Sequence, residues 1–453
     1  MTVTREQAPP AGFGARLRQV GPGLMAAATG VGAGDLVATL IAGADFGTVL
    51  LWAAVLGTLL KLGLAEAVGR WHLASGGTIL DGWRSLGRWA TTFFGIYAVV
   101  WGFVYGATAM SASGLPLNAM VEGLSVRYWG MICGVVGFLL VLLGRYRTIE
   151  KIMMMLVVVM FVTVVGTAVL VVPDLGDIAA GLVPRLPAGS LVNVLGLIGG
   201  VGGTITMAAY GYWTMAKGWR GPAWIRMMRL DNAVGYVMTG IFVVSMLVVG
   251  ADILAGRDVT SGDTGLLFLA DELATRYGGW ARLLFLMGFF AVSFTSLLGV
   301  WNGVSLLVAD WTRCVRLPHG PRAQLRVRDE DPVPDSDAER DLDAARDLDA
   351  GWEVDRPREA AERSVAFRGY LLWLTFPPMV LLFFDRPFQL TLVYGVLGAF
   401  FMPFLAITLL VLLNSGRVPG EHRSGWVSNG VLAASGLLFV VLLVNEVLDY
   451  LPT

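Results

Sequence analysis

The chain has 453 residues, of which 56% are hydrophobic and 15% charged, whereas an ordinary soluble domain has about 45–50% and about 25%. This composition, with a mean hydropathy of +0.68, argues against a soluble enzyme and indicates a membrane protein whose main partner is the lipid bilayer. A formal net charge of −1, three isolated histidines and two cysteines argue against nucleic-acid binding, a disulfide framework and a zinc site.

Apolar stretches of about 20 residues, the length of a membrane-crossing helix, predict an all-α membrane protein with eleven spans. They are expected at residues 20–44, 47–69, 89–113, 128–144, 152–172, 190–216, 230–256, 281–310, 367–384, 387–413 and 425–448. The chain therefore divides into an N-terminal cytoplasmic segment (1–19), spans 1–8 (20–312), a charged insert (313–365) and spans 9–11 (366–453).

Lys and Arg predict the orientation, because loops on the cytoplasmic side retain positive charge. With the N-terminus inside, fifteen of these residues flank the spans on the cytoplasmic side and six on the other side. We expect a multi-pass protein of the cytoplasmic (inner) membrane with its C-terminus outside. The insert 313–365, which contains RDEDPVPDSDAERDLDAARDLDAGWEVDRPREAAER, is expected to be a soluble cytoplasmic linker or, alternatively, a regulatory element.

Span 1 has an acid beside three closely spaced glycines. The stretch ATGVGAGDLVATL places Gly30, Gly32 and Gly34 at alternate positions before Asp35. A mid-membrane charge costs about 2.5–3.5 kcal/mol on insertion scales, and each glycine costs a helix about 0.8–1.0 kcal/mol relative to Ala. We expect an unwound stretch whose carbonyls, together with Asp35, bind a cation or polar ligand. The alternative is that the glycines only permit close helix packing.

Span 6 has a second glycine-rich stretch. It reads LGLIGGVGGTITMAAYGYWTM, with four glycines ahead of Met207, Tyr210 and Tyr212. Two interrupted spans, five spans apart, are the pattern of a transporter built from two halves of inverted topology, with its binding site between the interruptions.

Other polar and aromatic residues of the spans have less specific signals. Lys61 and Glu66 in span 2 lie about 140° apart on a helix, so we expect them to face different neighbours and to form ion pairs rather than bind ligand. Span 8 contains SFTSLLGVWNG, in which Asn302 and the hydroxyl residues either line a pathway or bond across helices. Trp101 and Tyr105 are expected to be packing or interfacial aromatics.

The stretch from Gly21 to Gly76 carries a set of short motifs. They are Gly21-Pro22, Ala38-Thr39, Ile41-Ala42-Gly43, Phe46-Gly47, Leu50-Leu51-Trp52 and Arg70 followed by Ala74-Ser75-Gly76. In these motifs the chain resembles the Nramp family of divalent-metal transporters, and weaker similarity continues through GGTITMAAYGYW, AVSFTSLLGVWNG and FFMPFLAITLLVLLN. The resemblance implies a leucine-transporter-like inverted repeat with helices 1 and 6 broken.

The ligand motifs of that family are altered here. The family's Asp-Pro-Gly-Asn motif of helix 1 falls on residues 32–35, so that one carboxylate remains, at Asp35. Its Met-Pro-His motif of helix 6 falls on residues 207–209, which keep Met207 and lack the histidine. The family's helix 10 glutamine falls near Tyr394.

Helix 3 of the family carries acids for proton passage, but here no Asp, Glu, His, Lys or Arg lies between Arg88 and Glu122. The resemblance and the residues together imply a secondary transporter of a divalent cation, Mn²⁺/Fe²⁺ or Mg²⁺, with weak or no proton coupling. The transported cation is the only ion expected, with no resident cofactor and no catalytic residues.

The expected ligands include a carboxylate, a soft sulfur and backbone carbonyls. The metal ligands are expected at Asp35, Met207, Gly30, Gly32 and Thr206. The pathway is expected to include Tyr210, Tyr394, Asn302 and Glu66. The alternative function is a carrier of a small organic solute, an amine or amino acid, with the same fold.

Overall fold

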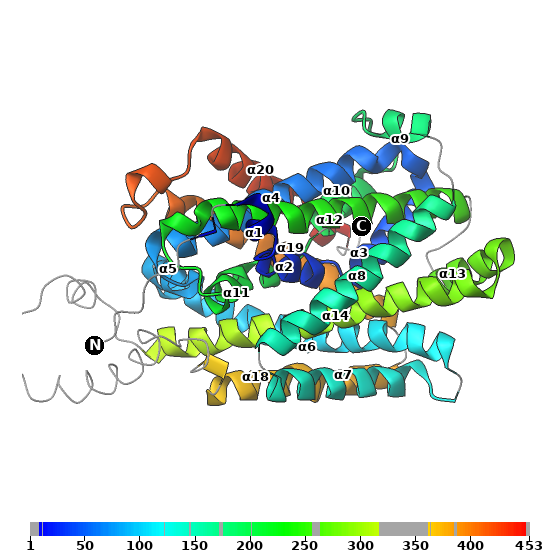
Figure 1. The fold of residues 1–453 in the computed structure, drawn as a ribbon, viewed down its shortest axis with the longest axis horizontal. Coiled ribbons are helices and arrows are strands. Elements are labelled where there is room, and N and C mark those ends of the chain that lie inside the picture. Colours follow the sequence, from blue (N-terminus) through cyan, green and yellow to red (C-terminus); the bar gives the residue numbers. More distant parts are fainter. Residues whose placement is uncertain are drawn as a thin grey trace, which may run out of the picture.

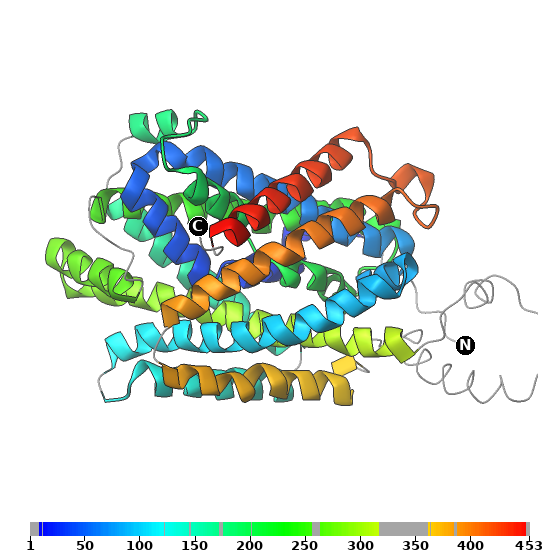
Figure 2. The same ribbon diagram turned by 180° about the vertical axis from the view of Figure 1, so that it is seen from behind.

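The structure, a computed structural model, describes residues 9–449 except 11, 122, 145, 172–174, 201, 256–262, 317–360, 363 and 385–386. All regular elements in this part of the chain are helices, as Figures 1 and 2 show. Within the described ranges, seven helical stretches are long and apolar enough to cross a membrane: Ala38–Ser75, Arg88–Met120, Val126–Leu143, Tyr146–Leu170, Pro222–Ile253, Gly279–Arg316 and Val365–Phe384. Two shorter apolar helices are Phe400–Leu413 and Trp426–Val441.

Nine of the expected spans correspond to helices with similar bounds. These helices are α4 (Leu51–Ser75), α6 (Arg88–Met120), α7 (Val126–Leu143), α8 (Tyr146–Leu170), α12 (Ile225–Ile253), α14 (Gly279–Arg316), α18 (Val365–Thr375) with the 3₁₀-helix η4 (Pro377–Phe384), α19 (Pro387–Leu413) and α20 (Trp426–Asp449). The ninth span changes from α to 3₁₀ at Pro377 and Pro378, because proline removes a backbone donor and clashes with the preceding turn.

Spans 1 and 6 each consist of short pieces. Span 1 comprises α2 (Pro22–Gly30) and α3 (Ala33–Phe46), and span 6 comprises α10 (Leu191–Gly200), η2 (Ile205–Ala209) and α11 (Tyr210–Ala216). In Figure 1, α2 and α11 lie in the middle of the molecule, with α4 and α12 above them and α6, α7, α14 and α18 below. The interruptions are therefore surrounded by long helices.

Further helices that the sequence did not predict lie before the spans, between them or at their starts. They are α1 (Phe13–Leu17), η1 (Gly47–Leu50), α5 (Ile79–Leu86), α9 (Leu175–Gly181), η3 (Pro222–Trp224), α13 (Asp263–Tyr277) and η5 (Gly420–His422). The start of α5 is well determined by its own residues. The Thr78 side chain accepts a hydrogen bond from the Asp81 backbone, and the Asp81 side chain accepts one from the Thr78 backbone, which is the capping box.

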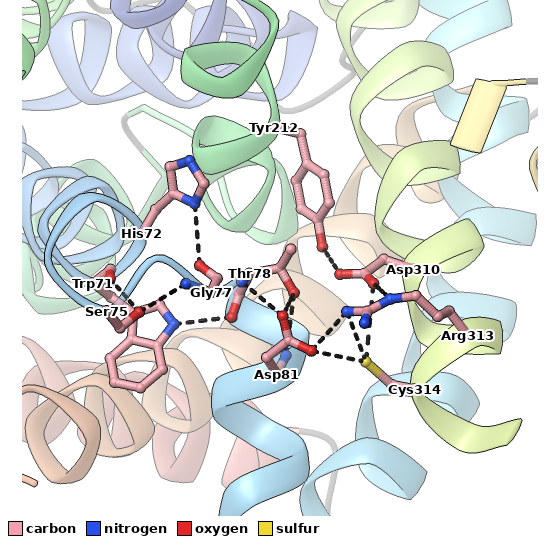
Figure 3. A network of polar contacts seen from close by, with 10 residues as sticks. All are labelled: Trp71, His72, Ser75, Gly77, Thr78, Asp81, Tyr212, Asp310, Arg313 and Cys314. Carbon is pink, nitrogen blue, oxygen red and sulfur yellow. Dashed lines mark hydrogen bonds and ion pairs between the residues drawn. The ribbon is translucent and has the colours of Figure 1, made fainter. Parts of the chain in front are cut away.

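Helix α14 continues through Arg316, past the expected start of the insert at residue 313. Arg313 is buried in a polar network that joins α5, α11 and α14 (Figure 3). Its Nε donates to Asp310 Oδ1 at 2.7 Å and its Nη2 to Asp81 Oδ1 at 2.6 Å. Tyr212 of α11 donates its hydroxyl hydrogen to the other oxygen of Asp310. The network therefore ties the second half of span 6 to α14 and α5.

The charge of Asp81 is stabilised by this network. Burial by itself would raise the pKa of Asp81, but the positive charge of Arg313 and hydrogen bonds from Thr78 outweigh it and hold the pKa below its ordinary value. The carboxylate is therefore ionised at neutral pH.

We expect Asp81→Asn to destabilise the protein by about 1.5–3 kcal/mol, the range for a hydrogen bond to a charged group. A lowered pKa means that the contribution is complete above the ordinary Asp value of about 3.9 and is lost only as the pH falls through the lower folded value. The difference in Tm between wild type and variant should therefore stay constant from about pH 5 to about pH 8. Thermal unfolding in detergent measures it, and a difference that vanishes at the acidic end would contradict this assignment.

Candidate metal centre

The two interruptions touch each other through their backbones. A Cβ on Gly30 would lie 2.6 Å from the backbone nitrogen of Gly203, and one on Gly203 would lie 2.9 Å from the Gly30 Cα. Neither distance can accommodate a methyl group, because the atoms opposite are main-chain atoms that cannot rotate away. Glycine at both positions is what allows spans 1 and 6 to meet here.

The local conformation explains why both spans stop at this level. Val31 leaves the helix with extended angles, φ −88° and ψ 102°, before α3 starts at Ala33. In span 6, Gly202 and Gly203 have φ values of 83° and 94°, a region that glycine adopts readily and other residues rarely. Two such residues in succession end the helix, and the chain resumes as the 3₁₀-helix η2.

Two side chains from neighbouring helices satisfy the carbonyls of the span 6 interruption. Lys61 of α4 is fully buried, and its Nζ donates a hydrogen bond to the Gly203 carbonyl at 2.5 Å. The same Nζ lies 5.1 Å from the centre of the Phe439 ring. Tyr236 of α12 donates to the Gly202 carbonyl at 3.3 Å. The Lys61 amino group therefore lies beside the interruption.

The span 1 interruption is contacted by α14 and α6. Ser296 Oγ donates to the Thr29 carbonyl at 2.8 Å, so the 2.7 Å contact between Tyr105 and Ser296 is a bond that the tyrosine donates. Tyr105 stacks on Trp101 with ring centres 4.6 Å apart, and its ring lies 5.2 Å from that of Tyr394. These rings form an aromatic wall of buried Trp101 and Tyr105 with Tyr394 beside the interruption, and neither Trp101 nor Tyr105 is an interfacial residue.

Several of the expected metal ligands come together at this place. Met207 is fully buried in η2, and Thr206 is buried next to it. A Cβ on Gly203 would lie 2.9 Å from Thr206 Oγ1 and 3.7 Å from Met207 Cγ. Gly32 faces Ser296, whose Oγ would be 3.2 Å from an added Cβ. Asp35 belongs to α3, but its side chain lies outside what the structure describes.

Three expected pathway residues have partners on other elements. The Tyr210 hydroxyl donates to Asp231 Oδ2 at 2.8 Å. Asn302 Oδ1 accepts from Trp213 Nε1 at 3.0 Å. Glu66 pairs with Arg70 at 3.2 Å and with Arg229 at 3.0 Å. The fourth, Tyr394 of α19, packs its ring against Trp101 and Tyr105 of α6 in the aromatic wall.

Asp231 is a buried acid that the sequence interpretation missed. It lies near the start of α12 with no exposed surface, and it accepts hydrogen bonds from the backbone N–H groups of Gly21 and Gly23 at 2.9 and 2.6 Å. With the bond from Tyr210, the carboxylate holds the first turn of α2 against α12 and α11. The sequence did contain a signal for this residue, since Asp231 is an acid at the second position of the apolar span 230–256.

The described residues contain no group of three or more His, Cys, Asp or Glu that could hold a metal. The donors at the interruptions are instead backbone carbonyls, the Thr206 hydroxyl and the Met207 sulfur. This set is neutral and combines hard oxygen donors with one soft sulfur, so a divalent cation here would require at least one carboxylate in addition.

The contact between the interruptions predicts the effect of adding one methyl group. Gly30→Ala should force the two backbones apart, cost about 1–3 kcal/mol as an overpacked substitution, and reduce transport into proteoliposomes strongly. Gly196→Ala is the matched control, because Gly196 lies in α10 with nothing within 4 Å of an added Cβ. Wild-type Tm and flux in Gly30→Ala would show that the contact is not required.

Residues 23–324 match the model of the family described as natural resistance-associated macrophage protein-like, Nramp. The chain is 25% identical over 320 residues to an uncharacterized protein of Pasteurella multocida, covering 67% of this chain and 73% of that protein. It is 26% identical over 309 residues to the divalent metal cation transporter MntH of Deinococcus radiodurans, covering 64% and 69%.

Among solved structures, a variant of the Eremococcus coleocola manganese transporter matches with a TM-score of 0.70 and 16% identity over 99% of this chain and 90% of that one. MhsT in complex with L-phenylalanine matches with a TM-score of 0.52 and 13% identity over 95% and 98%. At these identities the structures show a shared fold. The family model covers well over half of the sequence, and the chain therefore belongs to the Nramp family.

Proposed function

We propose that this protein is a secondary transporter that moves a divalent cation across the cytoplasmic membrane. The observation that carries the proposal is the contact of two interrupted spans at Gly30 and Gly203, with Met207 directly beside it. Family membership supports it, since a relative by sequence is named a divalent metal cation transporter and a structural neighbour a manganese transporter.

In this proposal Asp35 supplies the charged ligand and Met207 the soft one. Carbonyls near Gly30 and Gly32 and the Thr206 backbone complete the shell. A thioether binds Mn²⁺ or Fe²⁺ in preference to Mg²⁺, whereas a shell with few protein ligands suits a hydrated Mg²⁺. Both ions remain within the proposal, and no resident cofactor or catalytic residue is part of it.

The proposed architecture is a leucine-transporter-like inverted repeat of eleven spans, with spans 1 and 6 broken. The first half runs from α2 to α8 and the second from α10 to α19, each beginning with an interrupted span, and α20 is the eleventh. The supporting observation is that α2/α3 and α10/η2/α11 occupy corresponding positions in the two halves. The charge distribution supports an N-inside, C-outside orientation and a cytoplasmic insert at 313–365.

We further propose that transport is weakly coupled to protons or uncoupled. Helix α6 has no Asp, Glu, His, Lys or Arg between its first residue Arg88 and its end at Met120. Glu66 in α4 is held between Arg70 and Arg229, and the Lys61 ammonium is bonded to the Gly203 carbonyl. Both candidate relay groups therefore have fixed partners.

A small organic solute, an amine or amino acid, is the second candidate substrate. The Lys61 amino group beside the interruption is a hydrogen-bond donor of the kind that binds the carboxylate of an amino acid. The aromatic wall of Trp101, Tyr105 and Tyr394 offers apolar surface of the kind that lines solute sites. Calorimetry against Mn²⁺, Mg²⁺, Ca²⁺ and a panel of amines and amino acids distinguishes the two substrates.

Asp35→Asn should abolish cation-dependent flux in proteoliposomes, because it removes the charge that compensates the ion. The matched control is Asp45→Asn, which makes the same change at an exposed position of the same helix. Normal flux in Asp35→Asn would show that Asp35 is not a ligand of the transported cation.

Met207→Ala should lower the affinity for Mn²⁺ relative to Mg²⁺ and Ca²⁺, because hard ions gain nothing from a thioether. Calorimetry with each ion measures the ratio, and Met215→Ala in α11 is the control. An unchanged ratio of the Mn²⁺ and Mg²⁺ affinities would exclude the Met207 sulfur as a metal ligand. If Met207→Ala instead loses binding of an amino acid, the organic-solute carrier is favoured.

Proton coupling is tested with a pH-sensitive dye trapped in proteoliposomes while the divalent ion enters down its gradient. We expect uptake without acidification of the lumen, because the relay groups are missing from α6 or occupied. Stoichiometric acidification that disappears in Glu66→Gln would show instead that span 2 carries the protons.

A further inference from the structure

A cavity rich in arginine lies at the end of the bundle that the charge distribution predicts to be cytoplasmic. It has a volume of about 450 Å³ and opens between α1, the end of α4, the start of α12 and the connection from α19 to α20. This volume lies within the range of small-ligand sites, about 300–1,000 Å³. Its basic lining residues are Arg16, Arg70, Arg226, Arg229, His422 and Arg423.

Arg70 forms a preorganised part of this lining. Its side chain is 4% exposed, and its Nη2 donates to Ser428 Oγ at 2.6 Å and to Ser424 Oγ at 3.2 Å. These contacts and the ion pair with Glu66 hold the guanidinium group in place at the cavity wall.

The positive charge around the cavity is only partly balanced. Glu66 is shared between Arg70 and Arg229. Glu421, the acid among the described lining residues, has a 79% exposed side chain that lies 3.4 Å from His422 Nε2. Within the described ranges no carboxylate pairs with the remaining lining arginines, Arg16, Arg226 and Arg423. The described lining of the cavity therefore carries more positive than negative charge, which disfavours a divalent cation there.

We propose that this cavity binds the phosphate group of an anion, either the headgroup of an anionic phospholipid or a soluble phosphate compound. The guanidinium group is planar and always charged, and it binds two phosphate oxygens at once. Several such groups converge here from four segments that are distant in the sequence. The site is separate from the interruptions and does not rest on the proposed transport function.

The first experiment measures stabilisation of the purified full chain by two probes. One arm titrates sodium pyrophosphate in an uncharged detergent, and the other compares nanodiscs of phosphatidylcholine with and without phosphatidylglycerol. We expect the Tm to rise in at least one arm, because a ligand that binds only the folded state stabilises it, and the rise should shrink with added NaCl. A response only to lipid identifies a headgroup site, and a response only to pyrophosphate identifies a soluble ligand.

The second experiment removes charge from the lining without disturbing the core. The pair Arg226→Ala and Arg423→Ala changes two exposed side chains, so folding should be unaffected, and the half-saturating probe concentration should rise about tenfold, equivalent to about 1.4 kcal/mol. The matched pair Arg220→Ala and Arg417→Ala removes the same charge from exposed positions outside the cavity. No stabilisation in either arm, or equal weakening by both pairs, would overturn the proposal.

Discussion

The structure depends on one close backbone contact, between Gly30 of span 1 and Gly202 and Gly203 of span 6. Each interruption frees backbone groups in the middle of a membrane protein, where no solvent can satisfy them, so each must find partners inside the protein. The partners come from α4, α12 and α14, through Lys61, Tyr236 and Ser296. The long helices therefore satisfy the interruptions and are themselves positioned by them.

The buried lysine beside this contact constrains any substrate. Lys61 has no exposed surface, and its Nζ donates to the Gly203 carbonyl. A cation that takes this carbonyl as a ligand competes with that hydrogen bond, and a shell of carbonyls, a hydroxyl and a thioether offers it no negative charge. A cation site here therefore requires the Asp35 carboxylate close to the ion. The Lys61 amino group would instead donate to a carboxylate, so a carboxylate on the substrate favours the amino acid candidate.

Much of the fold followed from sequence, because span length and glycine spacing are local properties. The bounds of α7, α19 and α20 lie within two residues of the expected spans, and both glycine-rich stretches coincide with helix ends. The site was harder to predict. The partners of Asp231 are Gly21, Gly23 and Tyr210, and pairings across roughly 20 to 210 residues leave no periodic signal. For the same reason the position of Lys61 on the Gly203 carbonyl could not be inferred from its place in span 2.

Two helices connect the arginine cavity to the interruptions. Helix α12 carries Arg226 and Arg229 at the cavity, then Asp231 at the start of α2, and then Tyr236 at the Gly202 carbonyl. Helix α4 carries Arg70 at the cavity and Lys61 at the Gly203 carbonyl. A phosphate oxygen that draws Arg70 and Arg229 toward itself competes with Glu66, their shared partner. The cavity and the interruptions are therefore carried by the same two helices, with Glu66 as the acid that the two cavity arginines share.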